Sequence, residues 1–564
     1  MLASNKWIVQ LITDQCIAHG IKHIVFSPGS RNAPFAITFD QISSIQKHVI
    51  HDERVAAFYA LGLAENTNQP VAICCTSGSA ALNYYPAIAE AFYRSIPLVV
   101  ITADRPHAWT NQGDGQTIVQ KQVFQGHIRY EVQLDEQAET PEYLWYAQRE
   151  TALAFQKTQS GNKGPIHLNI GLKEPLYQTA EKTTNYSRKI SFSNTAISLS
   201  NTFLEQAKND LENSKILVLC GQMSPNRSLE IALSKFASNA NVTVLVENTS
   251  NLHDERFISC IDRTLNGIKT DEKSKFQPNI LISIGGAIVS KRIKSFLRES
   301  NLKAHWKIGF EFPEMDTYQQ LSHSIEMSPS AFFQQLNELD FQRNKINFFG
   351  IWKQIDYVAK DNLPYFFFEP KHLTDLLVFY NLFQFLPENV CFHIANSSVV
   401  RYTQLFDAVK SIRYDANRGT SGIDGSGSTA LGAAVGIPEK QHIFVTGDIS
   451  ALYDSNVFWN SNPPKNFKMI VVHNGGGGIF RIIPGPATSP QRSTYFEAIQ
   501  CQLVAKVAES FGWNTCTISD KDLLAEQLED FLQKDNPFQL LEIITDAEES
   551  PKHLDAFFEY LRGN

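Results

Sequence analysis

Asp448 and Asn474 each follow an apolar, β-rich run in the last third of the chain. Because adjacent parallel strands end at the same edge of a sheet, their side chains are expected to meet there. A carboxylate, an amide oxygen and a nearby backbone carbonyl are the hard ligands of a Mg²⁺ ion that keeps positions open for phosphate oxygens. Glycines 475–478 let a ligand approach the backbone, and a helix expected to start at Ser450 offers amides to an anion. Two ordinary strand-ending turns would also contain Asp and Asn-Gly, so the pattern alone leaves both readings open.

The elements that position these residues follow an alternation of strands and helices. This alternation predicts an α/β protein built from parallel sheets that are covered by helices on both faces. In such doubly wound sheets, ligands gather at the carboxyl ends of the strands. The predicted strands are 21–27, 71–76, 98–102, 216–220, 242–246, 280–284, 305–309, 390–394, 442–446, 469–472 and 540–544.

Two stretches interrupt the alternation and predict domain boundaries. Residues 183–202 are rich in Ser, Thr and Asn, which is typical of a linker, and residues from about 340 to 370 lose the regular pattern. The simplest division is three α/β domains, 1–182, 203–340 and 370–564. A length of 564 residues agrees with several domains, since one domain takes roughly 150 residues.

Composition excludes several classes of protein. The apolar and charged fractions, 43% and 19%, are near globular averages, and the net charge of −8 argues against a basic nucleic-acid coat. The eight cysteines contain no CxxC pair, so neither a disulfide framework nor a zinc site is expected. The first 16 residues are predicted to form an amphipathic helix, and no run reaches the ~18 apolar residues of a membrane helix. We therefore expect a soluble protein of a reducing compartment, the cytoplasm.

The segment around Asp448 and Asn474 resembles the signature of thiamine diphosphate (ThDP) enzymes, Gly-Asp-Gly followed at this distance by Asn-Asn. Here Ile449 replaces the last Gly and His473 the first Asn. The resemblance implies that Asp448, Asn474 and the carbonyl of Gly476 hold Mg²⁺, or Mn²⁺, on the cofactor diphosphate.

Glu53 matches a second feature of ThDP enzymes, a glutamate at a strand-to-helix junction near the N-terminus. In that family a carboxyl bonded to the pyrimidine ring activates the cofactor as an acid–base group. By itself, Glu53 is also a favourable first-turn charge at the start of a helix. Its occurrence with Asp448 and Asn474, in the expected order, favours the functional interpretation.

Within the ThDP enzymes, nearly the whole chain resembles the 2-succinyl-5-enolpyruvyl-6-hydroxy-3-cyclohexene-1-carboxylate (SEPHCHC) synthases of menaquinone biosynthesis. The densest matches are 27–32, 102–106, 396–401, 417–425 and 447–454, and the central block matches least. The resemblance implies that 2-oxoglutarate is decarboxylated and that its succinyl unit adds to isochorismate in a 1,4 sense. Both substrates are dicarboxylates, for which the planar guanidinium of arginine is well suited.

The resemblance also implies roles for individual positions. Isochorismate would face Ser30, Arg31, Arg105, Gln116, Lys291 and Arg292, and the succinyl end of 2-oxoglutarate would contact Ser397, Arg401 and Arg418. The implied cofactor contacts are Glu53, Asn396, Ser421, Gly422, Ile423, Gly447, Ser450, Ala451, Ile479 and Phe480. Each arginine taken singly fits a surface ion pair as well. Gly115 departs from the family, which often has Asn before the glutamine.

Three other functions fit parts of the sequence. Residues 425–430 follow the G-x-G-x-x-A pattern of dinucleotide-binding folds, but residues 421–424 separate them from any strand. Another ThDP carboligase or decarboxylase, of the acetohydroxyacid synthase type, would have no use for several arginines matched to carboxylates. A non-catalytic ThDP-fold protein would need Glu53 only as a helix-start charge. The resemblance further implies a homodimer or homotetramer whose active sites lie at the chain interface.

Overall fold

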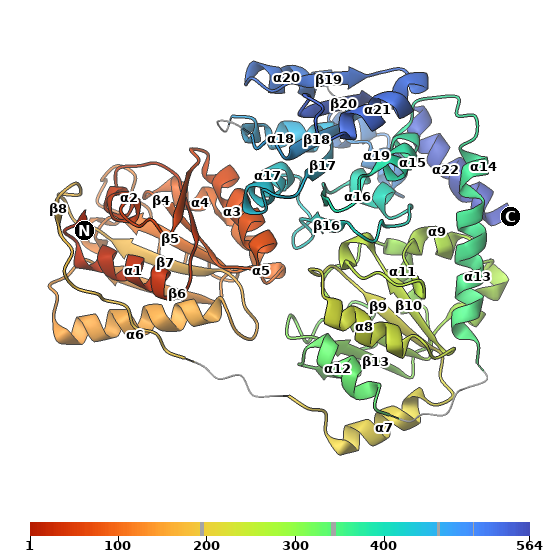
Figure 1. Ribbon diagram of the computed structural model, residues 1–564, viewed down its shortest axis with the longest axis horizontal. Coiled ribbons are helices and arrows are strands. Elements are labelled where there is room, and N and C mark those ends of the chain that lie inside the picture. Colours follow the sequence, from red (N-terminus) through yellow and green to blue (C-terminus); the bar gives the residue numbers. More distant parts are fainter. Residues whose placement is uncertain (192–196, 340–345, 460–462, 500, 564) are drawn as a thin grey trace. The chain divides into compact units, whose positions relative to one another are not determined.

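The computed structural model describes residues 1–563 except 192–196, 340–345, 460–462 and 500. Its described strands form three six-stranded sheets and one two-stranded sheet. The pairings described within the six-stranded sheets are parallel, and helices connect successive strands. The predicted α/β class with three doubly wound parallel sheets is therefore confirmed (Figure 1).

The N-terminal sheet has the strand order β3-β2-β4-β5-β7-β6. Continuous apolar runs such as 71–75 form its inner strands because both faces of the sheet are buried. The strands in this order are Gln46–Val49, His23–Phe26, Val71–Cys75, Leu98–Asp104, Ile166–Gly171 and Tyr130–Asp135. The helices are α1 (Trp7–Ala18), α2 (Ala33–Asp40), α3 (Glu53–Thr67), α4 (Ser79–Asn83), α5 (Tyr85–Tyr93) and α6 (Pro141–Lys157). A two-stranded antiparallel pair, β1 (Leu2–Ser4) with β8 (Thr179–Glu181), adjoins α1 and α2.

The central sheet has the order β11-β10-β9-β12-β13-β14. Three of its strands have the bounds expected from the sequence, 216–220, 242–246 and 280–284. The strands in this order are Phe257–Ile258, Val242–Val246, Ile216–Cys220, Ile280–Ile284, Ala304–Ile308 and His323–Ile325. The helices include α7 (Asn201–Leu211), α8 (Arg227–Phe236), α9 (Ile261–Asn266), α10 (Lys273–Phe276), α11 (Lys291–Arg298) and α12 (Pro329–Leu336).

The C-terminal sheet has the order β16-β15-β17-β18-β20-β19, so that β15, β17 and β18 are consecutive neighbours. The strands in this order are Arg413–Ala416, Cys391–Ile394, His442–Gly447, Phe467–His473, Leu540–Ile544 and Thr515–Ile518. The helices are α15 (Asp375–Phe385), α16 (Ser398–Thr403), α17 (Ser426–Gly436), α18 (Asp448–Tyr453), α19 (Ile479–Ile482), α20 (Val504–Ser510), α21 (Leu524–Leu532) and α22 (Glu549–Gly563).

The stretch expected to be irregular, 340–370, instead contains α13 (Phe348–Asp361) and α14 (Leu363–Phe366). Residue 340 and the rest of 340–345 lie outside the described residues. Phe348, Trp352 and Ala359 are buried along one face of α13, and the Trp352 ring packs edge-on against Phe276 and Phe296. A single apolar face of large aromatic residues thus stabilises a helix that the strand-and-helix alternation missed.

By internal contacts the chain forms two compact units. The first comprises Met1–Asn194, Asn417–His442 and Tyr453–Phe467, and the second comprises Thr195–Ala416, Ile443–Leu452 and Lys468–Asn564. In the described part of the chain, no helix combines the length and the apolar character that crossing a membrane requires.

Candidate active site

The carboxyl ends of β17 and β18 bring Asp448 into direct contact with Gly476. Asp448 is buried, and its Oδ2 accepts a hydrogen bond from the Gly476 amide at 2.8 Å. Its Oδ1 accepts from the Ile449 amide at 2.7 Å. Asn474, also buried, directly follows β18. The expectation that the ends of two neighbouring strands bring these residues to one sheet edge is confirmed.

The turn after Asn474 depends on glycine. Gly475 and Gly476 have φ angles of 76° and 117°, in a region of backbone conformation that residues other than glycine rarely adopt. A Cβ at Gly476 would lie 2.6 Å from the carbonyl oxygen of Glu497. The backbone at this edge therefore has a shape that most residues could not take.

The Asn474 amide is anchored by Asp375, the first residue of α15. Asn474 Nδ2 donates to Asp375 Oδ2 at 2.8 Å, and Thr545 Oγ1 donates to Asp375 Oδ1 at 2.6 Å. Burial raises the pKa of Asp375, while these two hydrogen bonds act in the opposite direction. This arrangement leaves the Asn474 Oδ1 on the opposite side of the amide from Asp375.

His473, which stands in place of the first Asn of the ThDP signature, lies between two acidic residues. Its Nδ1 is 2.7 Å from Glu542 Oε1, and its Nε2 is 4.0 Å from Asp448 Oδ2. The hydrogen bond to Glu542 and the nearby Asp448 raise the pKa of His473, against the effect of burial. Glu542 is fully buried and also accepts the amides of Val504 and Ala505 at the start of α20. His473 is therefore an integral part of this edge.

The other predicted cofactor contacts in the second unit follow the ends of β15, β17 and β18. A Cβ built at Gly447 meets no atom within 4 Å, so the backbone there faces open space. The Phe480 ring packs in a tilted arrangement against Phe496, with ring centres 5.7 Å apart. Buried members of this group are Asn396, Ser450, Ala451 and Ile479, and Gly447 and Phe480 are partly exposed.

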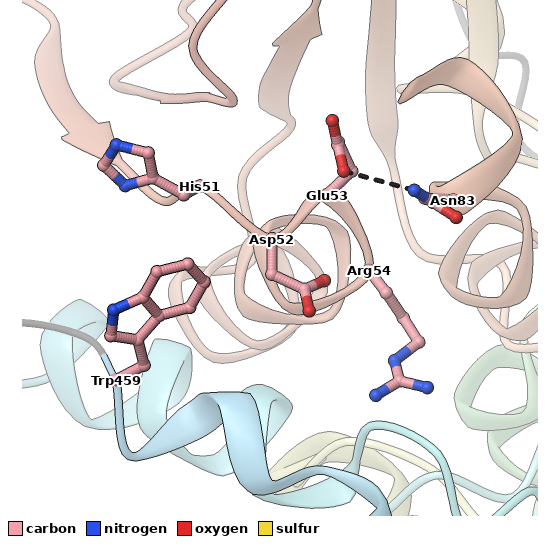
Figure 2. A pocket seen from close by; sticks show the side chains of 6 residues that line it. All are labelled: His51, Asp52, Glu53, Arg54, Asn83 and Trp459. Atoms are coloured by element: carbon pink, nitrogen blue, oxygen red, sulfur yellow. Dashed lines mark hydrogen bonds between the residues drawn. The ribbon is translucent and has the colours of Figure 1, made fainter. Parts of the chain in front are cut away.

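Glu53 begins α3 and lines a pocket of about 360 Å³ in the first unit (Figure 2). The side chain of the preceding residue, Asp52, caps the helix by accepting the Val55 amide at 3.1 Å. Glu53 Oε2 accepts a hydrogen bond from Asn83 Nδ2 at 3.2 Å. The carboxylate is partly exposed and points away from Trp459, which lines another side of the pocket. The pocket thus has a carboxylate on one wall and an aromatic ring on another.

Helix α3 is held in place by close packing against α17. A Cβ at Gly62 would lie 1.9 Å from the carbonyl oxygen of Thr429, and one at Gly432 would lie 2.0 Å from that of Tyr59. Gly425, the first glycine of the G-x-G-x-x-A pattern, faces the Phe58 ring in the same way. Helix packing therefore explains why Gly425, one glycine of this pattern, is a glycine, and no bound dinucleotide is needed to explain it.

The predicted isochorismate residues of the first unit lie after the ends of β2 and β5. Arg31 is buried, with Nη1 3.1 Å from the Leu172 carbonyl and Nη2 3.0 Å from Glu174. Arg105 pairs with Asp114 at 2.7 Å and donates from Nε to the Gly115 carbonyl at 3.0 Å. Because this contact uses backbone, it does not depend on the residue type at 115. Ser30 and Gln116 are exposed.

In the second unit, the positive charges of Arg292 and Arg401 both act to lower the pKa of the Asp262 carboxyl. Burial raises the pKa of Asp262, and the hydrogen bond from Ser290 and the two arginines oppose that rise. Arg292 also donates to Asn266 at 3.0 Å and lies over the Phe558 ring. Arg401 Nη1 donates to the carbonyl of Ser397, whose φ is 71°. The neighbouring Lys291 is exposed at the start of α11.

The loop that carries Arg418 is held by Glu90, a fully buried residue of α5. Glu90 accepts the amides of Gly419 and Thr420 at 2.9 and 2.6 Å, and the Thr420 hydroxyl at 2.8 Å. This loop continues through Ser421, which has a φ of 62°, to Gly422 and Ile423. Arg418, Gly422 and Ile423 are partly exposed and Ser421 is exposed.

Comparisons with known proteins agree with this geometry. The family "Thiamine pyrophosphate enzyme, N-terminal TPP binding domain" matches residues 6–128, "Middle domain of thiamine pyrophosphate" matches 183–391, and "Thiamine pyrophosphate enzyme, C-terminal TPP binding domain" matches 397–542. A SEPHCHC synthase of Flavobacterium johnsoniae is 41% identical over 98% of this chain and 99% of its own. Those of Christiangramia forsetii and Bacteroides thetaiotaomicron are 38% and 34% identical, over 99% and 100% of both chains.

The chain belongs to the SEPHCHC synthase family of thiamine pyrophosphate enzymes. The residues at the Asp448 edge fit the diphosphate end of that cofactor. They combine the buried carboxylate of Asp448, the Asn474 amide oxygen that faces away from Asp375, and the backbone of Gly475 and Gly476, which has no side chain to block a ligand. Such hard oxygen donors suit Mg²⁺ that also takes phosphate oxygens.

The structure adds site residues of this SEPHCHC synthase family member that the sequence reasoning missed. Asp375, Glu542 and Glu90 each contact the predicted site residues, or the loop that carries them, from elements distant in sequence. Asn83 contacts Glu53, and Trp459 lines the same pocket. Of these, only Asp375 has a local signal, since it follows the helix-capping Thr374.

Proposed function

We propose that this protein is a ThDP- and Mg²⁺-dependent transferase that makes SEPHCHC in menaquinone biosynthesis. It removes CO₂ from 2-oxoglutarate and adds the remaining succinyl unit to isochorismate in a 1,4 sense. The observation that carries the proposal is the 41% identity to a SEPHCHC synthase over almost the full length of both chains. The motifs at Glu53 and Asp448 support it, with Ile449 and His473 as the two departures from the ThDP signature.

In this proposal the cofactor is held at both ends. Asp448, Asn474 and the Gly476 carbonyl bind Mg²⁺ on the diphosphate, and Glu53 hydrogen-bonds the pyrimidine ring. When bound, ThDP supplies the nucleophilic carbon and accepts the electrons that decarboxylation releases. The chain supplies orientation and charge, and Glu53 holds the proton at the pyrimidine. The remaining cofactor contacts would be those predicted from the family resemblance, with Ile423 as an apolar contact to the cofactor.

Two of the proposed substrate arginines, Arg31 and Arg105, already pair with carboxylates of this chain. Arg31 contacts Glu174, whose side chain is 64% exposed, and Arg105 contacts Asp114 at 2.7 Å. The carboxylate partners are open to solvent, largely at Glu174 and partly at Asp114, so a substrate carboxylate can replace the internal partner. We propose that isochorismate does so at Arg31 and Arg105. The residues proposed to join them are Ser30, Gln116, Lys291 and Arg292 for isochorismate, and Ser397, Arg401 and Arg418 for 2-oxoglutarate.

The proposal also covers the domains of the chain, its oligomeric state and its location in the cell. Residues 1–182, 203–340 and 370–564 would be the pyrimidine-binding, central and diphosphate-binding domains. A homodimer or homotetramer would form complete sites between chains. The cytoplasmic location expected from the cysteine pattern belongs to the same proposal.

The test is a donor and acceptor assay on the purified protein. CO₂ release from 2-oxoglutarate and SEPHCHC formation are measured with and without isochorismate, ThDP and Mg²⁺. We expect SEPHCHC only when 2-oxoglutarate, isochorismate, ThDP and Mg²⁺ are all present. Pyruvate in place of 2-oxoglutarate should give no comparable CO₂ release. Preferred turnover of pyruvate would identify another ThDP carboligase. Failure of ThDP with Mg²⁺ to raise the melting temperature would contradict the cofactor assignment.

A further inference from the structure

A cluster of polar groups lies behind Asn474 and centres on Asp375, which is only 3% exposed. The cluster joins the start of α15, the end of β20 and the start of α22. Thr545 Oγ1 donates to Asp375 Oδ1 at 2.6 Å, and the Asp375 amide donates to Ser550 Oγ at 3.0 Å. Asn474 Nδ2 donates to the other carboxylate oxygen, Oδ2, at 2.8 Å. Both oxygens of Asp375 therefore accept hydrogen bonds.

This pattern determines which end of the Asn474 amide faces the sheet edge. An asparagine amide has a donor end and an acceptor end, and the contacts of each end decide how it is turned. The Asp375 oxygens are acceptors, so the Asn474 nitrogen must face them. Asn474 Oδ1 consequently points to the other side, as an oxygen ligand requires. If the amide were reversed, two oxygens would face each other inside the cluster and an N–H group would face the cation.

We propose that Asp375 is a positioning residue that orients the Asn474 amide so that its oxygen, and not its nitrogen, faces the metal. The inference rests on the proposed Mg²⁺-ThDP function. It assigns to that site a residue that holds a metal ligand in place and does not itself bind the metal. Residues that orient metal ligands typically change metal affinity by roughly 10–100-fold when they are altered. The same range is expected here.

The proposal is tested by exchanging the two groups. In Asp375→Asn, the hydroxyls of Thr545 and Ser550, which both donate to Oδ1 in the native protein, favour the amide oxygen at that position, so the new nitrogen faces Asn474. Asn474 must then turn its oxygen toward position 375 and its nitrogen toward the metal. In the double variant D375N/N474D, one oxygen of the carboxylate at 474 accepts from the amide at 375, and the other faces the metal. Binding lost in the single variant should therefore return in the double variant.

The readout is Mn²⁺ binding in the presence of ThDP, followed by electron paramagnetic resonance of the free ion. We expect Asp375→Asn to raise the Mn²⁺ Kd at least tenfold, and D375N/N474D to lie within about threefold of the native protein. Thr545→Val is the matched control, because it removes a hydrogen bond from the same cluster without reversing the amide. It should lower the melting temperature while leaving the Mn²⁺ Kd within about threefold.

Each outcome decides a separate question. An unchanged Mn²⁺ Kd in Asp375→Asn overturns the positioning role. If Asn474→Asp alone binds Mn²⁺ as tightly as D375N/N474D, the added charge explains the rescue and the positioning role is overturned as well. Should Asp375→Asn fail to fold, tighter binding by D375N/N474D than by Asn474→Asp supports the proposal, and equal or weaker binding overturns it. If the native protein with ThDP binds no Mn²⁺, the proposed cofactor function itself fails.

Discussion

The close packing of α17 on α3 predicts that Gly432→Ala destabilises the unit that carries Glu53. A Cβ at position 432 would lie 2.0 Å from the Tyr59 carbonyl oxygen. Non-bonded heavy atoms pack favourably only at about 3.5–4.0 Å. The helices must therefore separate locally by about 1.5 Å or more, because a backbone carbonyl cannot rotate away as a side chain can.

The size of the effect follows from two opposing contributions. Overpacking of a close contact costs about 1–3 kcal/mol, and backbone contact favours the upper part of that range. The better helix propensity of alanine offsets about 1 kcal/mol of this. The net loss should be about 2 kcal/mol. Gly436→Ala is the control: its new Cβ would meet Thr67 Cγ2 at 3.2 Å, a side-chain atom that can move. We expect Gly436→Ala to be neutral or slightly stabilising.

The assay is urea denaturation, followed by tryptophan fluorescence, together with ThDP titration of each variant. Gly432→Ala should unfold at lower urea than the native protein and Gly436→Ala. It should also bind ThDP more weakly, since the movement displaces Glu53 at the start of α3. Equal or higher stability of Gly432→Ala relative to Gly436→Ala would refute the packing argument. Lower stability with unchanged ThDP affinity would refute only the link to Glu53.

Three further predictions concern charge and metal. Glu53→Gln should bind ThDP but lose nearly all turnover, because the amide cannot exchange the pyrimidine proton; SEPHCHC formation at the native rate would contradict the assigned role. Burial raises the pKa of Asp454, whose carboxylate caps α17 through Ser428, to about 7. The folded protein binds this proton more tightly than the unfolded chain, so the associated stability is present below the ordinary value of 3.8 and is lost as pH rises through about 7. Asp454→Asn should therefore flatten the fall in melting temperature between pH 5 and 8, and equal slopes in the two proteins would be evidence against the shift. Dialysis against EDTA should abolish stabilisation by ThDP, which Mg²⁺ restores in the native protein but only weakly in Asp448→Asn; stabilisation by ThDP in metal-free protein would argue against a metal bridge.

Local sequence signals were sufficient for most inner strands of the three large sheets and for the placement of the main motifs. The edge strands β3, β6, β11, β14, β16 and β19, and the inner strand β7, were not predicted. Strands such as Ile216–Cys220 and Val242–Val246 are buried on both faces, so they are continuous apolar runs whose bounds can be read directly. Parallel strands end at one edge of a sheet, which brought Asp448 and Asn474 together without any knowledge of their contacts. The irregular stretch around α13 was misjudged because its apolar face is meaningful only against partners such as Phe276 and Phe296.

The residue types at the strand ends, together with the resemblance to ThDP enzymes, indicated the chemistry, because a carboxylate, an amide and glycines at strand ends act through local geometry. The groups that orient them were decided by tertiary structure alone. Asp375 and Glu542 are isolated carboxylates that reach Asn474 and His473 from α15 and β20, across roughly 70–100 residues of chain. No periodicity or spacing marks such a contact. It exists only because burial leaves each polar group to find a hydrogen-bond partner among the elements that the fold packs beside it.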